Sequence, residues 1–163
     1  MANLEEVSGY PLDAEQQERL FALQRMCVVC WTTTDGAPVG VSHRYMWAKG
    51  KIWVTTSSQR PRVRALQKRP KSCVVITGDG TEMGPDCTLT IKTTCVVHAD
   101  RETLDWFFSE FSKTLLPDMQ DAQDVMRGML DTKRRVVLEL TPVKTMSYDG
   151  GKLNEAIARE GLT

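Results

Sequence analysis

The sequence predicts a mainly β fold, an antiparallel Greek-key barrel of six to seven strands with flanking helices. The first observation is the order of the patterned segments: three strands, a short helix, two strands, two helices and two final strands. The second is that tight-turn signals such as Asp35-Gly36 separate neighbouring strands. The third is size, because 163 residues, 41% of them hydrophobic, suffice for one domain with a core.

The N-terminal part predicts a helix followed by a meander of strands. Residues 1–12 form a loose arm. Asp13 caps a helix that runs to Arg25, with Gln16 placed to complete a capping box. Apolar runs and turn residues then predict three strands, at 26–33, 38–47 and 51–57.

The middle of the chain predicts a short helix between strands. Pro61 suits the first helical position, where its missing N–H costs nothing, and Pro70 marks the end. The segment 71–77 is apolar without alternation, so we expect a strand buried on both faces. The segment 87–99 alternates and predicts a long strand with one buried face.

The last third predicts two helices and two strands. Apolar residues at helical spacing indicate a helix capped by Asp100 and a second one opened by Pro117, both lying over the sheet. Strands at 134–141 and 143–149 close the fold, and 154–163 is a polar tail with room for a short helix.

The balanced overall charge argues against a partner that is attracted by the net charge of the whole protein. Lys plus Arg and Asp plus Glu both number 21, so we expect neither nucleic acid nor a membrane surface as a partner. No apolar run is long enough to span a bilayer, and the acidic start is unlike a secretory signal. These features predict a cytoplasmic protein whose five cysteines are reduced thiols.

A local anion site is predicted where the third strand runs into the short helix. Four hydroxyl side chains, Thr55, Thr56, Ser57 and Ser58, precede the helix N-terminus, where free N–H groups and the helix dipole favour an anion. The nearby cations can complete a phosphate cradle: Arg60, Arg62, Arg64 and Lys68. The alternative is a capped helix whose basic side is merely solvated.

Cys27 and Cys30 have the spacing of a redox or zinc pair, but they lie in a predicted strand. Three residues apart on a strand, the two thiols point to opposite faces, so we interpret them as core cysteines. With two histidines and no second cysteine pair, no metal site is predicted.

The histidines and tryptophans are weaker signals. His43 and Arg44 point to opposite faces of their strand, so at most one of them faces a ligand directly. Trp47 and Trp53 fall on facing strands of a hairpin, where they can simply pack across it. His98, beside the cap at Asp100, is interpreted as structural.

Three segments together resemble the pyridoxamine 5′-phosphate oxidase-like family of flavin-binding split β-barrels, which includes deazaflavin F420-dependent reductases. Segment 44–50 is similar to the family's flavin-contacting strand, and 55–70 to its phosphate-binding strand, loop and helix. Segment 142–150 resembles its closing strand, and the likeness spans about 26–153. The C-terminal arginine and histidine motif of vitamin B6 oxidases is missing after Gly151, so that activity is not expected.

The resemblance implies a single split-barrel domain over residues 1–163 that binds FMN, or alternatively F420, at a homodimer interface and transfers hydride to or from a small substrate. It places Arg62 as the basic phosphate ligand, favours Arg44 over His43 as a cofactor contact, and sets Tyr148 beside the flavin across the interface. An F420 tail would lie along Arg60, Arg64, Lys68 and Lys71. No catalytic residue is identified, because the cofactor carries the redox step.

Two other interpretations stay open. A carrier on the same barrel would hold a flavin, haem or tetrapyrrole, with His43 or His98 as a plausible axial ligand for haem. A purely structural domain with an empty site would leave the clustered arginines unexplained.

Overall fold

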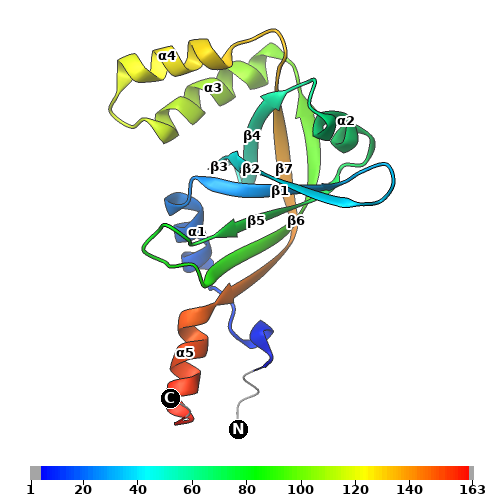
Figure 1. Cartoon of the computed structure of the whole chain (residues 1–163). Coiled ribbons are helices and arrows are strands. Elements are labelled where there is room, and N and C mark those ends of the chain that lie inside the picture. Colours follow the sequence, from blue (N-terminus) through cyan, green and yellow to red (C-terminus); the bar gives the residue numbers. More distant parts are fainter. Residues whose placement is uncertain (1–4, 162–163) are drawn as a thin grey trace.

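The computed structural model describes residues 5–161, which form one curled antiparallel sheet with flanking helices (Figure 1). The helical elements are η1 (Val7–Gly9), α1 (Ala14–Leu23), α2 (Pro61–Lys68), α3 (Arg101–Leu115), α4 (Gln120–Leu130) and α5 (Gly150–Arg159). The strands are β1 (Met26–Thr32), β2 (Pro38–Arg44), β3 (Met46–Ala48), β4 (Lys51–Ser57), β5 (Lys71–Thr77), β6 (Cys87–His98) and β7 (Arg135–Asp149).

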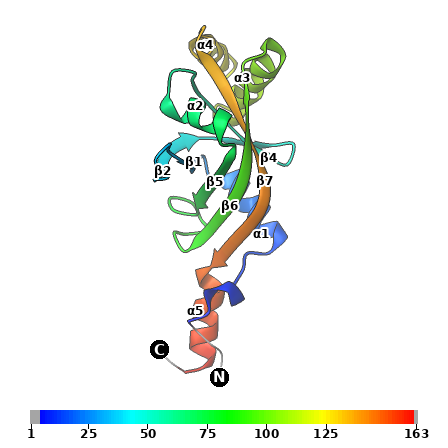
Figure 2. The same cartoon turned by 90° about the vertical axis from the view of Figure 1, so that its right-hand side faces the viewer.

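The strand order is β2-β1-β5-β6-β7-β4-β3, and every neighbouring pair is antiparallel. The two longest strands, β6 and β7, pair along most of their length with a register shift after Lys92. Such a bulge bends and twists a strand pair, and the sheet curls into a half-barrel (Figures 1 and 2). The predicted split-barrel fold is confirmed.

Two apolar clusters hold the sheet and helices together. The larger one fills the half-barrel, where α1 contributes Leu20 and the strands contribute Val29, Ile52, Leu89 and Leu138, all fully buried. The second lies between α3 and the opposite face of the sheet and includes Met46, Trp53, Phe107, Phe111 and Val137. The aromatic stripe of α3 is therefore packing, as its spacing predicts.

The prediction of one strand over 38–47 is wrong. The segment forms two strands, β2 and β3, which lie at opposite edges of the sheet. Tyr45 separates β2 from β3 and is 1% exposed. Its N–H donates to the carbonyl of Arg25 at 3.3 Å, and its hydroxyl donates to the carbonyl of Phe21 at 3.2 Å. Burial of this one side chain against the end of α1 sets the crossing point.

Two further strand predictions need correction. The expected strands 134–141 and 143–149 are one continuous strand, because Pro142 falls at the bulge opposite Lys92 and Thr93, where the ladder is already irregular. Strand 71–77 is not buried on both faces, since Val74 and Ile76 are buried while Cys73 and Val75 are partly exposed. Its outward face borders a groove.

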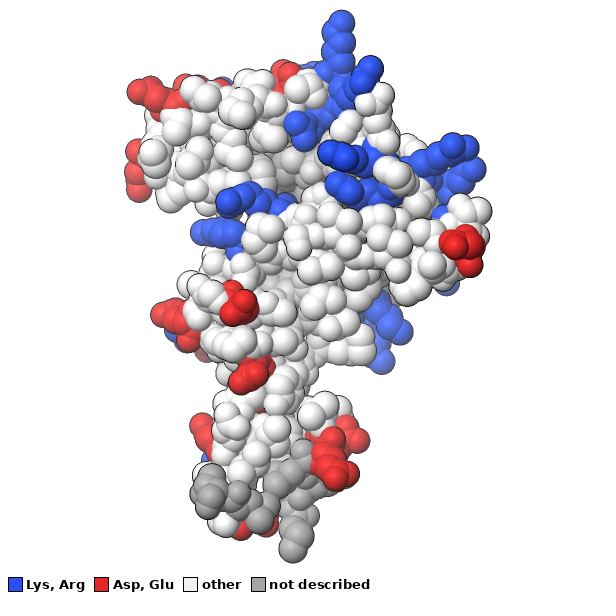
Figure 3. Space-filling view, in the orientation of Figure 1, with Lys and Arg blue, Asp and Glu red and all other residues white. Residues whose placement is uncertain are grey.

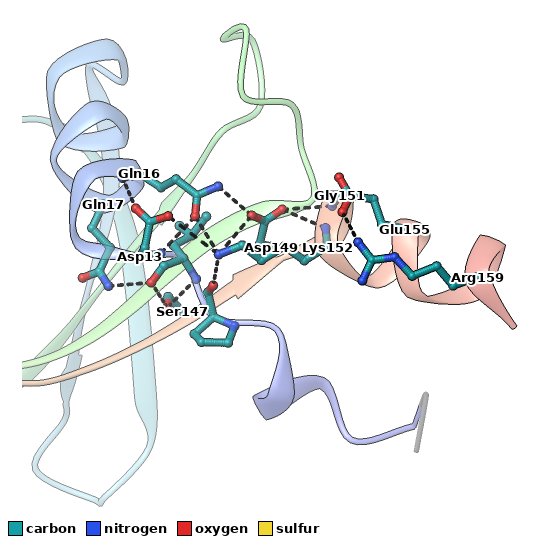
Figure 4. A network of polar contacts seen from close by, with 11 residues as sticks. Asp13, Gln16, Gln17, Ser147, Asp149, Gly151, Lys152, Glu155 and Arg159 are labelled. Carbon is teal, nitrogen blue, oxygen red and sulfur yellow. Dashed lines mark hydrogen bonds and ion pairs between the residues drawn. The ribbon is translucent and has the colours of Figure 1, made fainter. Parts of the chain in front are cut away.

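The chain ends and the second helix also differ from expectation. Asp118 has a φ of 62°, and this left-handed turn delays α4 to Gln120. Of the arm at 1–12, residues 1–4 lie outside the described part, and Leu12 is only 2% exposed. The expected tail 154–163 is partly helical, because α5 runs to Arg159. Asp149 caps this helix, and the Asp149 carboxylate accepts a hydrogen bond from Gln16 Nε2 at 2.8 Å (Figure 4).

Candidate functional site

The helix α2 has two chemically different faces. It begins at Pro61 and ends before Pro70, as these two prolines predict. Val63 and Leu66 are buried in the barrel and fix the rotation of the helix. Pro61 occupies the first turn, and Arg60 at the N-cap makes no side-chain cap hydrogen bond. With the apolar residues inward, the basic residues four apart must face outward.

The outward face forms what we call the basic groove, a hollow of about 650 Å³ between α2 and the β1–β2 turn. Its basic and hydroxyl residues are Ser58, Arg60, Arg64, Lys68, Arg69, Thr33 and Thr34. Figure 3 shows Lys and Arg side chains gathered over this part of the surface. Arg69 is held in place by donating from Nε and Nη2 to the carbonyl of Thr32, at 3.3 and 3.0 Å.

A second group, the inner cluster, consists of His43, Thr56 and Arg62. Arg62 Nη2 donates to Thr56 Oγ1 at 3.0 Å, while Arg62 Nε has no hydrogen-bond partner in the described structure. His43 is 9% exposed, and its Nε2 has no hydrogen-bond partner there either. Burial, with the neighbouring charge of Arg62, lowers the pKa of His43 to about 4. The inner cluster is therefore cationic and under-satisfied.

Charge near Arg62 is uncompensated within residues 5–161. No ion pair joins Arg62 to a carboxylate there, and the charge that acts on its pKa is that of Arg60. Burial and Arg60 together lower the pKa of the Arg62 guanidinium. A partly buried cation without a counter-charge costs free energy, and an anion bound beside it would recover that cost.

Several other residues predicted to bind the cofactor lie outside both the inner cluster and the basic groove. Thr55 Oγ1 donates to the carbonyl of Val136 at 2.9 Å, and Ser57 Oγ accepts from the N–H of Gln59 at 3.4 Å. Tyr148 pairs with Thr88 far along β7, toward α5. Lys71 lines a different groove from Arg60, Arg64 and Lys68, so the predicted four-cation stripe is split.

Arg44 lies apart from the inner cluster. It is exposed and borders a hollow of about 390 Å³ under the α3–α4 hairpin, lined by Leu115, Leu116, Ala122, Val125, Met126 and Met129. Its neighbour His43, ranked second from the sequence, is the one that faces Arg62. The pairing of His43 with the buried Cys27 explains this, because that register turns His43 into the barrel.

His98 and the tryptophans have packing and ion-pair roles. His98 Nε2 lies 3.1 Å from Glu139 Oε2, and its Nδ1 lies 3.4 Å from Asp100 Oδ2, so both ring nitrogens are engaged. Trp47 and Trp53 do not pack on each other, because Met46 is the residue opposite Trp53. Trp47 stacks on Phe21 at 4.0 Å, and Trp53 meets Trp106 edge-on at 4.7 Å.

Residues 5–161 contain neither a cluster of metal-ligating side chains nor a membrane-spanning helix. No group of three or more His, Cys, Asp or Glu side chains in that range could hold a metal ion. None of the helices described there has the length and apolar content required to cross a membrane.

Comparison with known proteins identifies relatives of the fold. The family model for pyridoxamine 5′-phosphate oxidase matches residues 12–147. A conserved hypothetical protein from Mycobacterium tuberculosis has a TM-score of 0.75 at 17% identity, covering 88% of each chain. An F420 reductase has a TM-score of 0.56 at 15% identity, covering 78% of this chain and 94% of that chain.

A third solved structure, a heme storage protein from Vibrio cholerae, has a TM-score of 0.65 at 12% identity and covers 83% of this chain and 94% of that chain. These structural likenesses, all at low identity, show a shared fold. No curated protein sequence matches the chain.

Proposed function

The chain belongs to the pyridoxamine 5′-phosphate oxidase family, and we propose that it is an oxidoreductase that binds FMN, or alternatively F420, as a homodimer. In this proposal it transfers hydride to or from a small organic substrate. The carrying observation is the inner cluster: within residues 5–161, Arg62 has no acidic partner, and Arg62 Nε and His43 Nε2 have no hydrogen-bond partner. Fold neighbours include an F420 reductase and an FAD-binding protein, which supports a flavin-type ligand.

The inner cluster fits a phosphate better than a neutral ligand. Arg62 stays partly exposed, so an anion can reach part of its guanidinium. The Nε–H is buried, and a small shift of the side chain would make it one more donor. A phosphate beside Arg62 would offset the charge of Arg62, which disfavours protonated His43, so the pKa of the buried His43 would rise. The bound flavin or deazaflavin would supply the hydride chemistry, while these residues hold its phosphate.

The basic groove offers a binding place that F420 would use and FMN would not. Arg60, Arg64 and Lys68 line it together and lie on the same helix as Arg62. A compact FMN needs one phosphate site, whereas F420 carries a polyanionic tail that three further cations can hold. We therefore assign the phosphate to the inner cluster and, for F420 only, the tail to the basic groove.

The homodimer is proposed from apolar side chains that the single chain leaves exposed. Val143 is 69% exposed, Met146 41% and Val96 47%, and all three lie on the paired strands β6 and β7. Exposed apolar patches of this kind mark association surfaces. Tyr148, near the end of the same strand, would then lie near a cofactor bound across the interface.

A carrier of haem on the same fold is the second candidate. The fold likeness to a heme storage protein favours it, but His98 already has carboxylates at both ring nitrogens. His43, the other histidine of the chain, has a ring nitrogen without a hydrogen-bond partner among residues 5–161, and its side chain is 9% exposed. For His43 to bind the iron of a haem, the barrel would have to open around this buried side chain.

Titration of the purified protein tests the proposal. FMN, F420 and haemin are added separately, and binding is followed by fluorescence quenching or by a shift of the absorbance band. Saturable binding of FMN or F420, at one site per chain, is the expected result. Saturable binding of haemin alone would favour the carrier, and no binding of any of the three would contradict a cofactor function.

A further inference from the structure

Two cysteines that are far apart in the sequence lie opposite each other on neighbouring strands. Cys30 on β1 and Cys73 on β5 are direct partners in the antiparallel register. Directly opposed residues of an antiparallel pair have Cα atoms about 4.5 or 5.5 Å apart, depending on the hydrogen-bonding position. Both values lie within the range of about 4.4–6.8 Å that a disulfide bond requires. The backbone therefore already holds these cysteines at bonding distance.

The pair also lies on the accessible face of the sheet. Cys30 and Cys73 are partly exposed and line the outer groove, a hollow of about 670 Å³ that also includes Lys71, Lys92, Val143 and Met146. The other three cysteines are buried, with exposures of 3% for Cys27, 8% for Cys87 and 5% for Cys95. In the single chain, a small oxidant can thus reach this pair in preference to the rest. The dimer contact that we propose at Val143 and Met146 lies on β7, which β6 separates from the cysteine strands β1 and β5.

Local packing shows the present direction of the Cys30 side chain. Its neighbour on β2 is Gly40, and a Cβ built on that glycine would lie 3.2 Å from Cys30 Sγ. The sulfur of Cys30 therefore leans toward β2, on the side away from Cys73. Formation of the disulfide requires a rotation about χ1 that turns Sγ toward β5.

We propose that Cys30 and Cys73 are a redox modification site, at which a peroxide converts the two thiols into a reversible cross-strand disulfide. One thiolate attacks hydrogen peroxide, the O–O bond breaks, and the products are a sulfenic acid and hydroxide. The second thiol then attacks the sulfenic sulfur, forms the S–S bond and releases water. Overall, two thiols are oxidised by two electrons and one peroxide is reduced to two waters.

Reactivity at this pair depends on pH. Burial raises the pKa of both thiols, while the charge of Lys92, the residue opposite Cys73 on β6, acts in the other direction on Cys73. Lys71 and Lys92 are the charged side chains that line the outer groove. Because the thiolate is the nucleophile, cross-linking should become faster as the pH rises toward the thiol pKa.

The bond would constrain the segment that contains the proposed cofactor site. The chain between Cys30 and Cys73 includes β2, β3, β4 and α2, and thus both the inner cluster and the basic groove. Cross-linking its two ends limits the conformations that this segment can sample when the fold opens. The oxidised protein should accordingly show a higher melting temperature than the reduced protein.

Peptide mapping of the full-length protein tests the proposal directly. The reduced chain is treated with hydrogen peroxide, its remaining thiols are alkylated, and a tryptic digest is examined without reductant. We expect peptide 26–44 linked to peptide 72–92, a fall in titratable thiols from five to three, and reversal by dithiothreitol. Sulfinic or sulfonic acids without a cross-link, or only links between chains, would overturn the proposal.

Matched variants assign the bond, because each of these peptides carries two cysteines. Peptide 26–44 also holds the inward-facing Cys27, and peptide 72–92 also holds Cys87. Cys30→Ser and Cys73→Ser should each abolish the link, whereas Cys27→Ser and Cys87→Ser should retain it. Fragmentation of the linked peptides from the unmodified chain gives the same assignment if a variant fails to fold. Loss of the link in Cys27→Ser, or a wild-type bond through Cys27 or Cys87, would refute it.

Discussion

The inner cluster and the basic groove lie on two faces of one helix, yet their cations are in different physical states. In the inner cluster, Arg62 is partly buried, has no acidic partner in the described part of the chain and stands beside the buried His43. In the basic groove, Arg64 and Lys68 border an open hollow where water can solvate them. Both places carry positive charge, but among residues 5–161 only the first has buried side-chain nitrogens without a hydrogen-bond partner.

This difference indicates where a ligand would gain the most free energy. A charge that is already hydrated gains little from an ion pair, typically up to about 1 kcal/mol. A hydrogen bond to a partly buried charge contributes more, roughly 1.5–3 kcal/mol. The inner cluster should therefore dominate cofactor affinity, and the basic groove should adjust it. Variants at each of the two places can test this ranking.

The largest effect is expected at Arg62. Arg62→Ala should weaken binding of FMN, or of F420 if that is the cofactor, by about 2 kcal/mol or more, which is roughly 30-fold. Fluorescence titration of the variant measures the change. Arg159→Ala is the control, because Arg159 lies on α5 with a side chain that is 79% exposed. An unchanged affinity in Arg62→Ala would move the phosphate site away from the inner cluster.

The next effect concerns pH and arises from His43. Its folded pKa of about 4 lies below the ordinary value of 6.5, so the unfolded chain binds more protons between these values. Stability is thus complete above pH 6.5 and is lost as the pH falls toward 4, by about 2 kcal/mol at pH 5. Urea unfolding at pH 7 and pH 5 measures this.

The control for that experiment is His43→Gln, which removes the titrating group and keeps a polar side chain of similar reach. The variant should lose most of the difference between pH 7 and pH 5. If its pH dependence equals that of the unmodified chain, other groups must cause the loss, and the inner cluster would be less strained than we infer. Added FMN should also reduce the difference, because a bound phosphate favours protonated His43.

A third prediction separates stability from binding at the same position. Arg62→Met removes a partly buried, uncompensated charge, so the cofactor-free protein should gain about 0.5–1 kcal/mol in its free energy of unfolding. Cofactor binding should nevertheless be lost. Urea unfolding without ligand provides the measurement, with Arg64→Met in the basic groove as the control. Destabilisation by Arg62→Met would show that the guanidinium supports the fold instead.

The ends of α2 were predictable from sequence because proline acts locally. Pro61 and Pro70 fix where the helix can begin and end, and spacing by four then places Arg60, Arg64 and Lys68 on one face. The strand alternation of β6 is equally local. These features need no knowledge of neighbours, and the structure confirms them.

The features that sequence reasoning missed depend on long-range pairing. The break at Tyr45 follows from its burial against α1, and the single strand β7 follows from a bulge that belongs to β6 as much as to Pro142. The inward position of His43 is set by its register with Cys27. Cys30 and Cys73 show the same limit, since 43 positions separate two residues that the sheet makes neighbours.

The smallest expected effect sharpens the comparison between cofactors. Lys68→Ala in the basic groove should leave FMN affinity nearly unchanged, because FMN needs only the phosphate site at Arg62. For F420 the same variant should weaken binding about threefold, and added salt should diminish the difference because these charges are solvated. Titrations with both cofactors at low and high salt provide the measurement. Equal losses for FMN and F420 would mean that Lys68 contacts the common phosphate, and the assignment of the two faces of α2 would then have to be reversed.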